Sequence, residues 1–140
     1  MALPHGTRVL GQQHIETVLA GSALAKGDLV QSTEATGSNT VDNAATNVPV
    51  YGFTKEAIAS AATGLADRIA TYDRFWVKVT TGTVSATTIG KFFSIVDELS
   101  ITLTASEVDG RVVGWDGATT DFCIVEFASP ESASPTVLVA

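Results

Sequence analysis

The chain has 140 residues, of which 45 % are hydrophobic and 16 % are charged, and its formal net charge is −7. This length favours one domain with a genuine core, and the scattered basic residues argue against direct nucleic-acid binding, which needs clustered Lys and Arg. A lone cysteine excludes a disulfide within the chain. We expect no signal peptide and no membrane span, and therefore synthesis in the cytoplasm.

The first 13 residues carry little core pattern, and Pro4 and Gly6 discourage regular structure there. We predict an N-terminal arm over residues 1–13, in which residues 7–10 form one short strand. Such an arm either frays or docks on a partner. The main domain is expected over residues 14–128.

Residues 15–19 alternate apolar and polar side chains, which predicts a strand. A turn at residues 25–28 then leads into a strand at 29–31. Residues 33–47 are rich in Ser, Thr, Asn, Ala and Gly, and this composition predicts an exposed loop.

Residues 55–72 allow two interpretations. An amphipathic helix is favoured by apolar residues at helical spacing, although Gly64 weakens a helix by about 1 kcal/mol relative to Ala; these residues are Ile58, Ala61, Leu65, Ile69 and Tyr72. The alternative is a short helical turn or loop that ends near Gly64, followed by a strand at 67–71. We favour the alternative because of the resemblance described below.

From residue 48 to residue 127, short β-type runs are punctuated by Gly and Asp. They cover residues 48–53, 75–79, 92–96, 100–104, 111–115 and 122–127. Several short strands at such spacing predict a small barrel or sandwich. The spacing of Thr104 and Glu107 allows one helical turn, and Asp116-Gly117 predicts a hairpin turn. After a linker at 129–135, residues 136–140 form a β-prone apolar tail that needs a sheet to pair with.

No catalytic constellation is present. His5 and His14 are the only histidines and have no clustered partners, so we expect no metal site. Gly90-Lys91 is followed by Phe92, where a phosphate-binding loop requires Ser or Thr. Cys123 lies in an apolar run and is expected to be an inert core thiol. The sequence therefore predicts no catalytic residue, no cofactor and no enzymatic activity.

Trp76 and Trp115 lie within predicted strands. Aromatic side chains in strands are usually core or interface anchors. A ligand-stacking surface is the alternative.

Four segments carry a family resemblance: residues 25–30 (AKGDLV), 51–64 (YGFTKEAIASAATG), 75–79 (FWVKV) and 112–115 (VVGW). Together they resemble small capsid decoration (cement) proteins of tailed bacteriophages and prophages, of the phage-lambda head-stabilising type. The resemblance implies a mainly β fold, a small tulip-like barrel or sandwich with one or two short helices. It also implies a loop or brief helix, then a strand, over residues 55–72.

The function implied by the resemblance is structural. Homotrimers would sit on the outer surface of the expanded capsid, at local three-fold axes, and clamp neighbouring major capsid protein subunits, without nucleic acid or membrane. Strand addition onto the shell is expected from both ends of the chain; the docking candidates are Thr7, Arg8, Val9, Leu10, Thr136, Val137, Leu138 and Val139. The candidates for the interface between subunits are His14, Trp76 and Trp115. The alternatives are a head–tail joining or tail-tube protein, and a carbohydrate- or ligand-binding β module.

Overall fold

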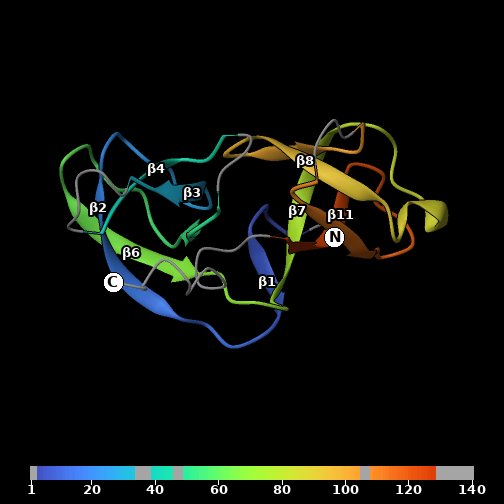
Figure 1. Cartoon of the computed structure of the whole chain (residues 1–140), viewed down its shortest axis with the longest axis horizontal. Helices are drawn as coiled ribbons and strands as arrows, with labels where there is room; N and C mark the ends of the chain where they lie inside the picture. Colours follow the sequence, from blue (N-terminus) through green and yellow to red (C-terminus); the bar gives the residue numbers. More distant parts are fainter. Residues whose placement is uncertain (1–2, 34–38, 46–48, 105–107, 129–140) are drawn as a thin grey trace, which may run out of the picture.

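The computed structural model describes residues 3–33, 39–45, 49–104 and 108–128. Within them, the helical structure is a single 3-10 turn, η2 (Ala86–Thr88), and the rest of the regular structure is β (Figure 1). The strands are β1 (Thr7–Leu10), β2 (Ile15–Ala20), β3 (Leu29–Ser32), β4 (Thr40–Asn43), β5 (Gly52–Thr54), β6 (Thr63–Arg68), β7 (Arg74–Thr81), β8 (Phe92–Asp97), β9 (Ser100–Thr102), β10 (Gly110–Gly114) and β11 (Phe122–Phe127).

The N-terminal half of the chain closes into a barrel with the strand order β2-β4-β3-β5-β6. Strand β2 pairs in parallel with β4 and antiparallel with β6, and the remaining neighbours are antiparallel. Alternate side chains of each strand point inward, and they form a small core that includes Val18, Val30, Val41 and Tyr51. We call this unit the N-terminal barrel.

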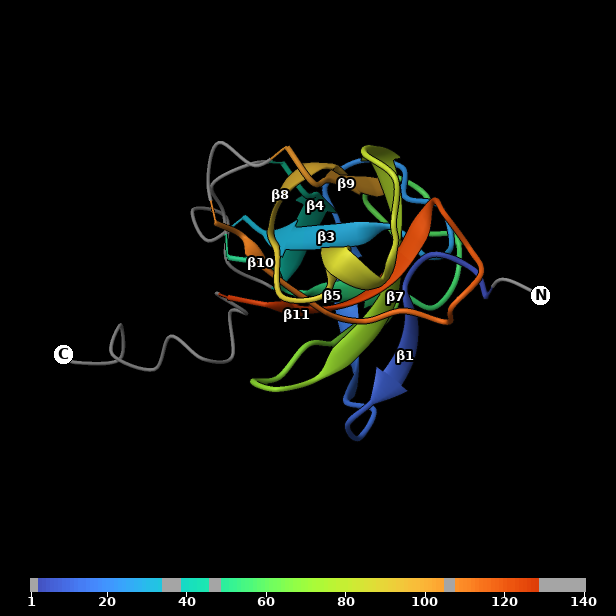
Figure 2. The same cartoon turned by 90° about the vertical axis from the view of Figure 1, so that its right-hand side faces the viewer.

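The second half of the chain forms a sheet in the order β1-β7-β11-β10-β8-β9, and β9 also pairs with β7. This extra pairing closes β7, β11, β10, β8 and β9 into a second ring, the C-terminal barrel. Strand β7 is long enough for two partners on one edge: β1 pairs with its residues 74–76, and β9 pairs in parallel near Val79 and Thr81. Figure 2 shows β1 beside β7, outside this ring.

The larger apolar core, that of the C-terminal barrel, extends into the N-terminal half of the chain. Phe53 of β5 lies with its ring centroid 4.9 Å from that of Phe75 on β7 and 6.1 Å from that of Phe127 on β11. Leu29 and Ile69 of the N-terminal half belong to the same buried cluster. Burial of such large apolar side chains is the main favourable contribution to folding, so the junction itself contributes to stability.

A mainly β protein built on a small barrel was predicted from the sequence, and this class is confirmed; the chain forms two such barrels. Strands are found at the predicted segments 15–19, 29–31, 75–79, 92–96, 111–115 and 122–127, with ends shifted by one or two residues. The run predicted at 100–104 is a strand only at 100–102, and that predicted at 48–53 is a strand only from Gly52. The hairpin predicted around Asp116-Gly117 is confirmed by the antiparallel pairing of β10 with β11.

The exposed loop predicted over residues 33–47 is wrong at residues 40–43, which form β4. Val41 is fully buried in the N-terminal barrel, and β4 pairs with both β2 and β3. One apolar side chain among polar neighbours gives almost no periodic signal. Long-range backbone pairing, rather than local composition, fixes this strand.

Residues 55–72 contain no helix. The favoured alternative, a loop followed by a strand, is confirmed. The strand lies at 63–68 rather than at 67–71. Gly64 sits inside β6, where an added Cβ would lie 2.6 Å from a side-chain carbon of Ile58. The glycine therefore marks a close approach of two segments and not the end of a helical turn.

The prediction of a free N-terminal arm over residues 1–13 is wrong for residues 7–10. The short strand at residues 7–10 is confirmed, but it is β1, paired with β7 of its own chain. The predicted helical turn at 104–107 extends into residues outside the described ranges, and the linker and tail predicted at 129–140 lie wholly outside them.

Gly52 provides a test of barrel closure. Replacing it with Ala places a Cβ 2.1 Å from the backbone oxygen of Asp67 on β6, and backbone atoms cannot swing away as a flexible side chain can. We expect Gly52→Ala to lower the free energy of unfolding by about 1–3 kcal/mol, measured by urea denaturation. In the control Gly114→Ala, the nearest atom is a side-chain carbon of Ile124 at 3.1 Å. A control loss as large as that of Gly52→Ala would contradict this account.

Candidate functional site

A buried ionic cluster joins β1 to the N-terminal barrel. The guanidinium of Arg8 donates two hydrogen bonds to the carboxylate of Asp67, from Nε at 3.0 Å and from Nη2 at 2.8 Å. Its Nη1 lies 2.7 Å from an oxygen of Asp73, which immediately precedes β7. The three side chains are 9 %, 5 % and 7 % exposed. We call Arg8, Asp67 and Asp73 the junction triad.

Further contacts surround the triad. Arg8 lies over the ring of Phe75, 4.7 Å from its centroid, and also donates to the backbone oxygen of Arg68. The backbone N–H of His14 donates to Asp67, and the backbone N–H of Ala70 donates to Asp73. Burial alone would lower the pKa of Arg8, but the bonds to the two carboxylates outweigh it and raise the pKa above its ordinary value. The guanidinium is therefore a fixed charge within the chain.

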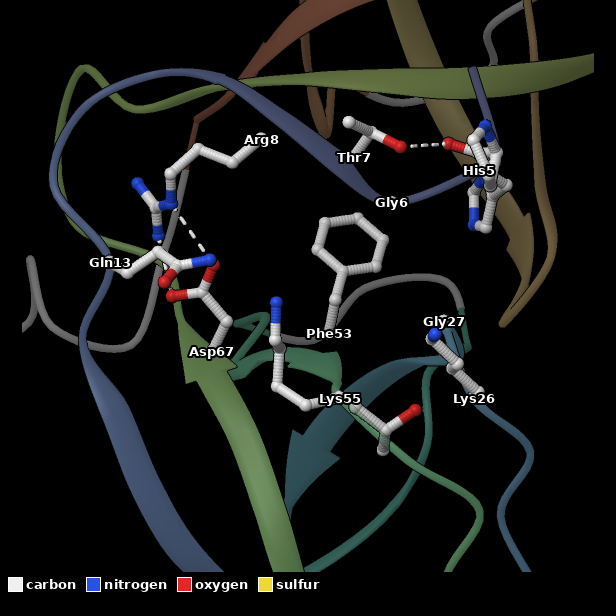
Figure 3. A pocket seen from close by; sticks show the side chains of 12 residues that line it. His5, Gly6, Thr7, Arg8, Gln13, Lys26, Gly27, Phe53, Lys55 and Asp67 are labelled. Carbon is white, nitrogen blue, oxygen red and sulfur yellow. Dashed lines mark hydrogen bonds and ion pairs between the residues drawn. The ribbon is translucent and has the colours of Figure 1, made fainter.

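A cavity of about 510 Å³ opens beside the triad, between the segment that carries β1 and the N-terminal barrel (Figure 3). Its wall includes His5, Lys26, Phe53 and Lys55, which come from the segment before β1, the β2–β3 turn and β5. The ring of Phe53 gives this wall an apolar surface, and Lys26 and Lys55 place amino groups beside it. No nucleophile lies next to a general base in the wall. Such a wall suits packing or anion attraction better than acid–base chemistry.

Two nucleophilic groups away from this cavity, the thiol of Cys123 and the hydroxyl of Tyr51, belong to buried residues. Burial raises the pKa of the Cys123 thiol to about 12, as predicted for an inert core residue. Burial, followed by the hydrogen bond to Glu16, raises the pKa of Tyr51 to about 12. In the described ranges, no three His, Cys, Asp or Glu side chains are grouped as a metal site would require. None of the described helical structure is long and apolar enough for a membrane span.

The structure divides the predicted N-terminal docking residues into two kinds. Thr7 is half-buried and donates its hydroxyl to the backbone oxygen of Pro4, and Arg8 belongs to the triad. Val9 and Leu10 are 43 % and 53 % exposed. Among the described strands, β1 pairs with β7 alone. The described ranges do not include Thr136, Val137, Leu138 or Val139.

The residues predicted for a subunit interface are not brought together in one patch. His14 is exposed before β2 of the N-terminal barrel, and Trp115 follows β10 of the C-terminal barrel. Trp115 donates its indole N–H to the backbone oxygen of Thr119 at 2.6 Å. Trp76 is 4 % exposed and stacks on Phe122, with ring centroids 5.6 Å apart. Trp76 thus packs within its own chain.

The sequence analysis missed the residues that organise the junction. Arg8 was assigned to docking, Asp67 was considered only as the first residue of a predicted strand, and Asp73 was given no role. Arg8 and Asp67 are 59 positions apart, so no local spacing relates them. The available signal was the presence of acidic residues within otherwise apolar strand patterns, since a buried carboxylate needs a partner.

Comparisons with known proteins identify the fold and no sequence family. No family model and no curated protein matches the chain. Among solved structures, the head fibre gp8.5 N base of bacteriophage phi29 is similar with a TM-score of 0.58 and 13 % sequence identity. The match covers 85 % of this chain and 98 % of the other. The two chains thus share a fold across nearly all of the phage protein's base.

The junction triad makes a direct prediction. Replacing Arg8 with Met leaves two buried carboxylates without their counter-charge, so we expect Arg8→Met to lower the free energy of unfolding by about 3–5 kcal/mol. Arg74→Met removes a similar arginine from a more exposed pair with Glu126, at 40 % and 23 % exposure, and is expected to cost less than about 1 kcal/mol. Urea denaturation of both variants measures the difference. Equal losses would mean that the triad has no special role.

Proposed function

We propose that this protein is a structural component of a bacteriophage virion and attaches to the phage head. The single observation that carries the proposal is the similarity of the double-barrel fold to the base of a phage head fibre, over 85 % of this chain. The resemblance of short segments to phage decoration proteins points the same way. Because a fold hosts many functions, the assignment depends on the binding experiment below.

In the finer form of the proposal, the protein is a cement protein on the outer surface of the expanded capsid, made in the host cytoplasm. It acts without catalysis, and its partners are the major capsid protein and two further copies of itself. A protein that binds only the expanded lattice stabilises that lattice by mass action. A trimer at a local three-fold axis multiplies weak contacts through effective concentration.

The docking contact is proposed to be the free edge of β1. Edge strands present unpaired backbone groups that accept another strand, and β1 combines such an edge with exposed Val9 and Leu10. The apolar residues Thr136 to Val139 are the second docking segment in this proposal.

The fold similarity favours a second candidate, the base of a projecting head fibre. Both candidates bind the head, but a fibre base carries further protein outward from the shell. Electron microscopy of decorated heads separates them, since cement protein forms compact knobs and a fibre base carries a projection. The number of copies per virion separates a cement protein, which is present in hundreds of copies, from a head–tail joining ring, which is present in about a dozen.

Binding to expanded heads that lack decoration tests the proposal and its docking edge. We expect saturable attachment and higher resistance of the heads to heat. Val9→Lys adds a charge to the proposed edge and should weaken attachment at least tenfold. The control Val96→Lys adds the same charge to β8, at a valine that is also 43 % exposed, and should bind as the unmodified chain does. Absence of saturable attachment by the unmodified chain would refute the proposal. Equal binding by both variants would refute only the β1 docking edge.

Solution mass tests the proposed trimer. Sedimentation or light scattering of the purified chain is expected to give about three times the subunit mass of 14.5 kDa. A species that remains monomeric at all concentrations would restrict trimer formation to the capsid surface and would contradict a preformed trimer.

A further inference from the structure

His5 connects three segments at the junction of the barrels. Its ring lies edge-on to Phe53 of the N-terminal barrel, with centroids 5.5 Å apart. Its Nδ1 lies 3.0 Å from the backbone nitrogen of Lys78 on β7, and its Nε2 lies 3.1 Å from the backbone oxygen of Glu98. The same oxygen accepts the backbone N–H of Leu29 from β3, at 2.9 Å. One imidazole thus links the segment before β1 to both barrels.

These contacts require one protonation state. The backbone N–H of Lys78 can only donate, so Nδ1 must accept with its lone pair. The carbonyl of Glu98 can only accept, so Nε2 must carry the proton. The neutral ring with its proton on Nε2 satisfies both contacts. A proton added to Nδ1 would face the N–H of Lys78 and replace a hydrogen bond with a repulsive contact.

We propose that His5 is a pH-sensitive latch, which holds the N-terminal segment across the barrel junction when neutral and releases it when a proton from solvent binds Nδ1. The latch is separate from the proposed docking edge and does not depend on the phage assignment. Release leaves β1 held by the junction triad, so the change is confined to the residues before β1 and to the adjoining wall of the cavity.

The charged groups around the ring set the direction of its titration. Burial is the largest influence and lowers the pKa of His5 below its usual 6.5. The bond to Glu98 and the charge of Asp97 oppose this shift, whereas the charge of Lys78 adds to it. The net direction is downward, so the folded protein holds the neutral ring more strongly than the unfolded chain does.

Other cations line the same cavity. Lys26 reaches the cavity from the β2–β3 turn, Lys55 from the end of β5, and Arg8 from β1, where Asp67 neutralises it. A protonated His5 would add a further positive charge to this wall.

The sign of the effect on stability follows from the lowered pKa. Above pH 6.5 the ring is neutral in both states and the contribution of His5 to stability is complete. As the pH falls from 6.5 towards the lower pKa of the folded state, the unfolded chain binds more protons and that contribution is lost. Within this window, His5 raises the equilibrium constant for unfolding by at most about tenfold per pH unit.

A site-resolved NMR titration tests the latch. As the pH falls from 6.5 to the lower midpoint of the His5 ring titration, protection of the Lys78 amide against hydrogen exchange is expected to fall by up to about tenfold per pH unit, after correction for the intrinsic rate. The Leu29 amide shares the acceptor Glu98 but does not touch the ring, so its protection should stay constant. Lys78 protection that remains unchanged while His5 titrates would overturn the proposal, as would a His5 midpoint at or above 6.5.

Two variants complete the experiment. The Gln amide offers an acceptor and a donor but does not titrate, so His5→Gln is expected to abolish the pH-dependent loss at Lys78. His14→Gln alters the exposed histidine and should behave as the unmodified protein. If His5→Gln retains the full pH-dependent loss at Lys78, another group is responsible and the latch is refuted. Should that variant fail to fold, the titration of the unmodified chain decides alone.

Discussion

The junction triad is the constraint on which the arrangement of the two barrels depends. Arg8 comes from β1, Asp67 from the last strand of the N-terminal barrel, and Asp73 from the approach to β7. Three buried charges are tolerated only when their geometry satisfies all of them together. The apolar contact of Phe53 with Phe75 holds the barrels together without direction, so the triad and hydrogen bonds such as that from Leu29 N–H to the Glu98 oxygen supply the directional part of the junction.

Barrel closure explains where the molecule can still pair with other chains. In both rings each strand finds two neighbours, which removes the free edges that promote association. β1 lies outside this arrangement because it shares one edge of β7 with β9. Among the strands of the described ranges, the one added outside a ring is therefore also the one with a free edge, and the triad fixes its position. This combination is what a rigid docking element requires.

The sequence predicted those strands whose own residues carry the signal. Residues 75–79 and 122–127 alternate large inward side chains such as Phe75 and Val125, and they were located closely. Strand β4 was missed because Val41 is the only apolar residue among its four. Closure of the C-terminal barrel depends on Val79 pairing with Ile101, and the triad pairs Arg8 with Asp67. Such contacts between distant positions leave no trace in local periodicity.

The same distinction explains how a fold is shared at 13 % sequence identity. A small barrel requires inward apolar residues of suitable size and turns at suitable places, and many sequences meet that pattern. The polar contacts of Arg8 and His5 require specific atoms at specific distances, so they tolerate far less substitution. This chain and its structural neighbour thus share a fold, and the pattern of inward apolar residues and turns that a barrel fold requires is met by many sequences. The more specific requirements of its own junction are the polar contacts of Arg8 and His5, which lie on the segment that also carries the free edge.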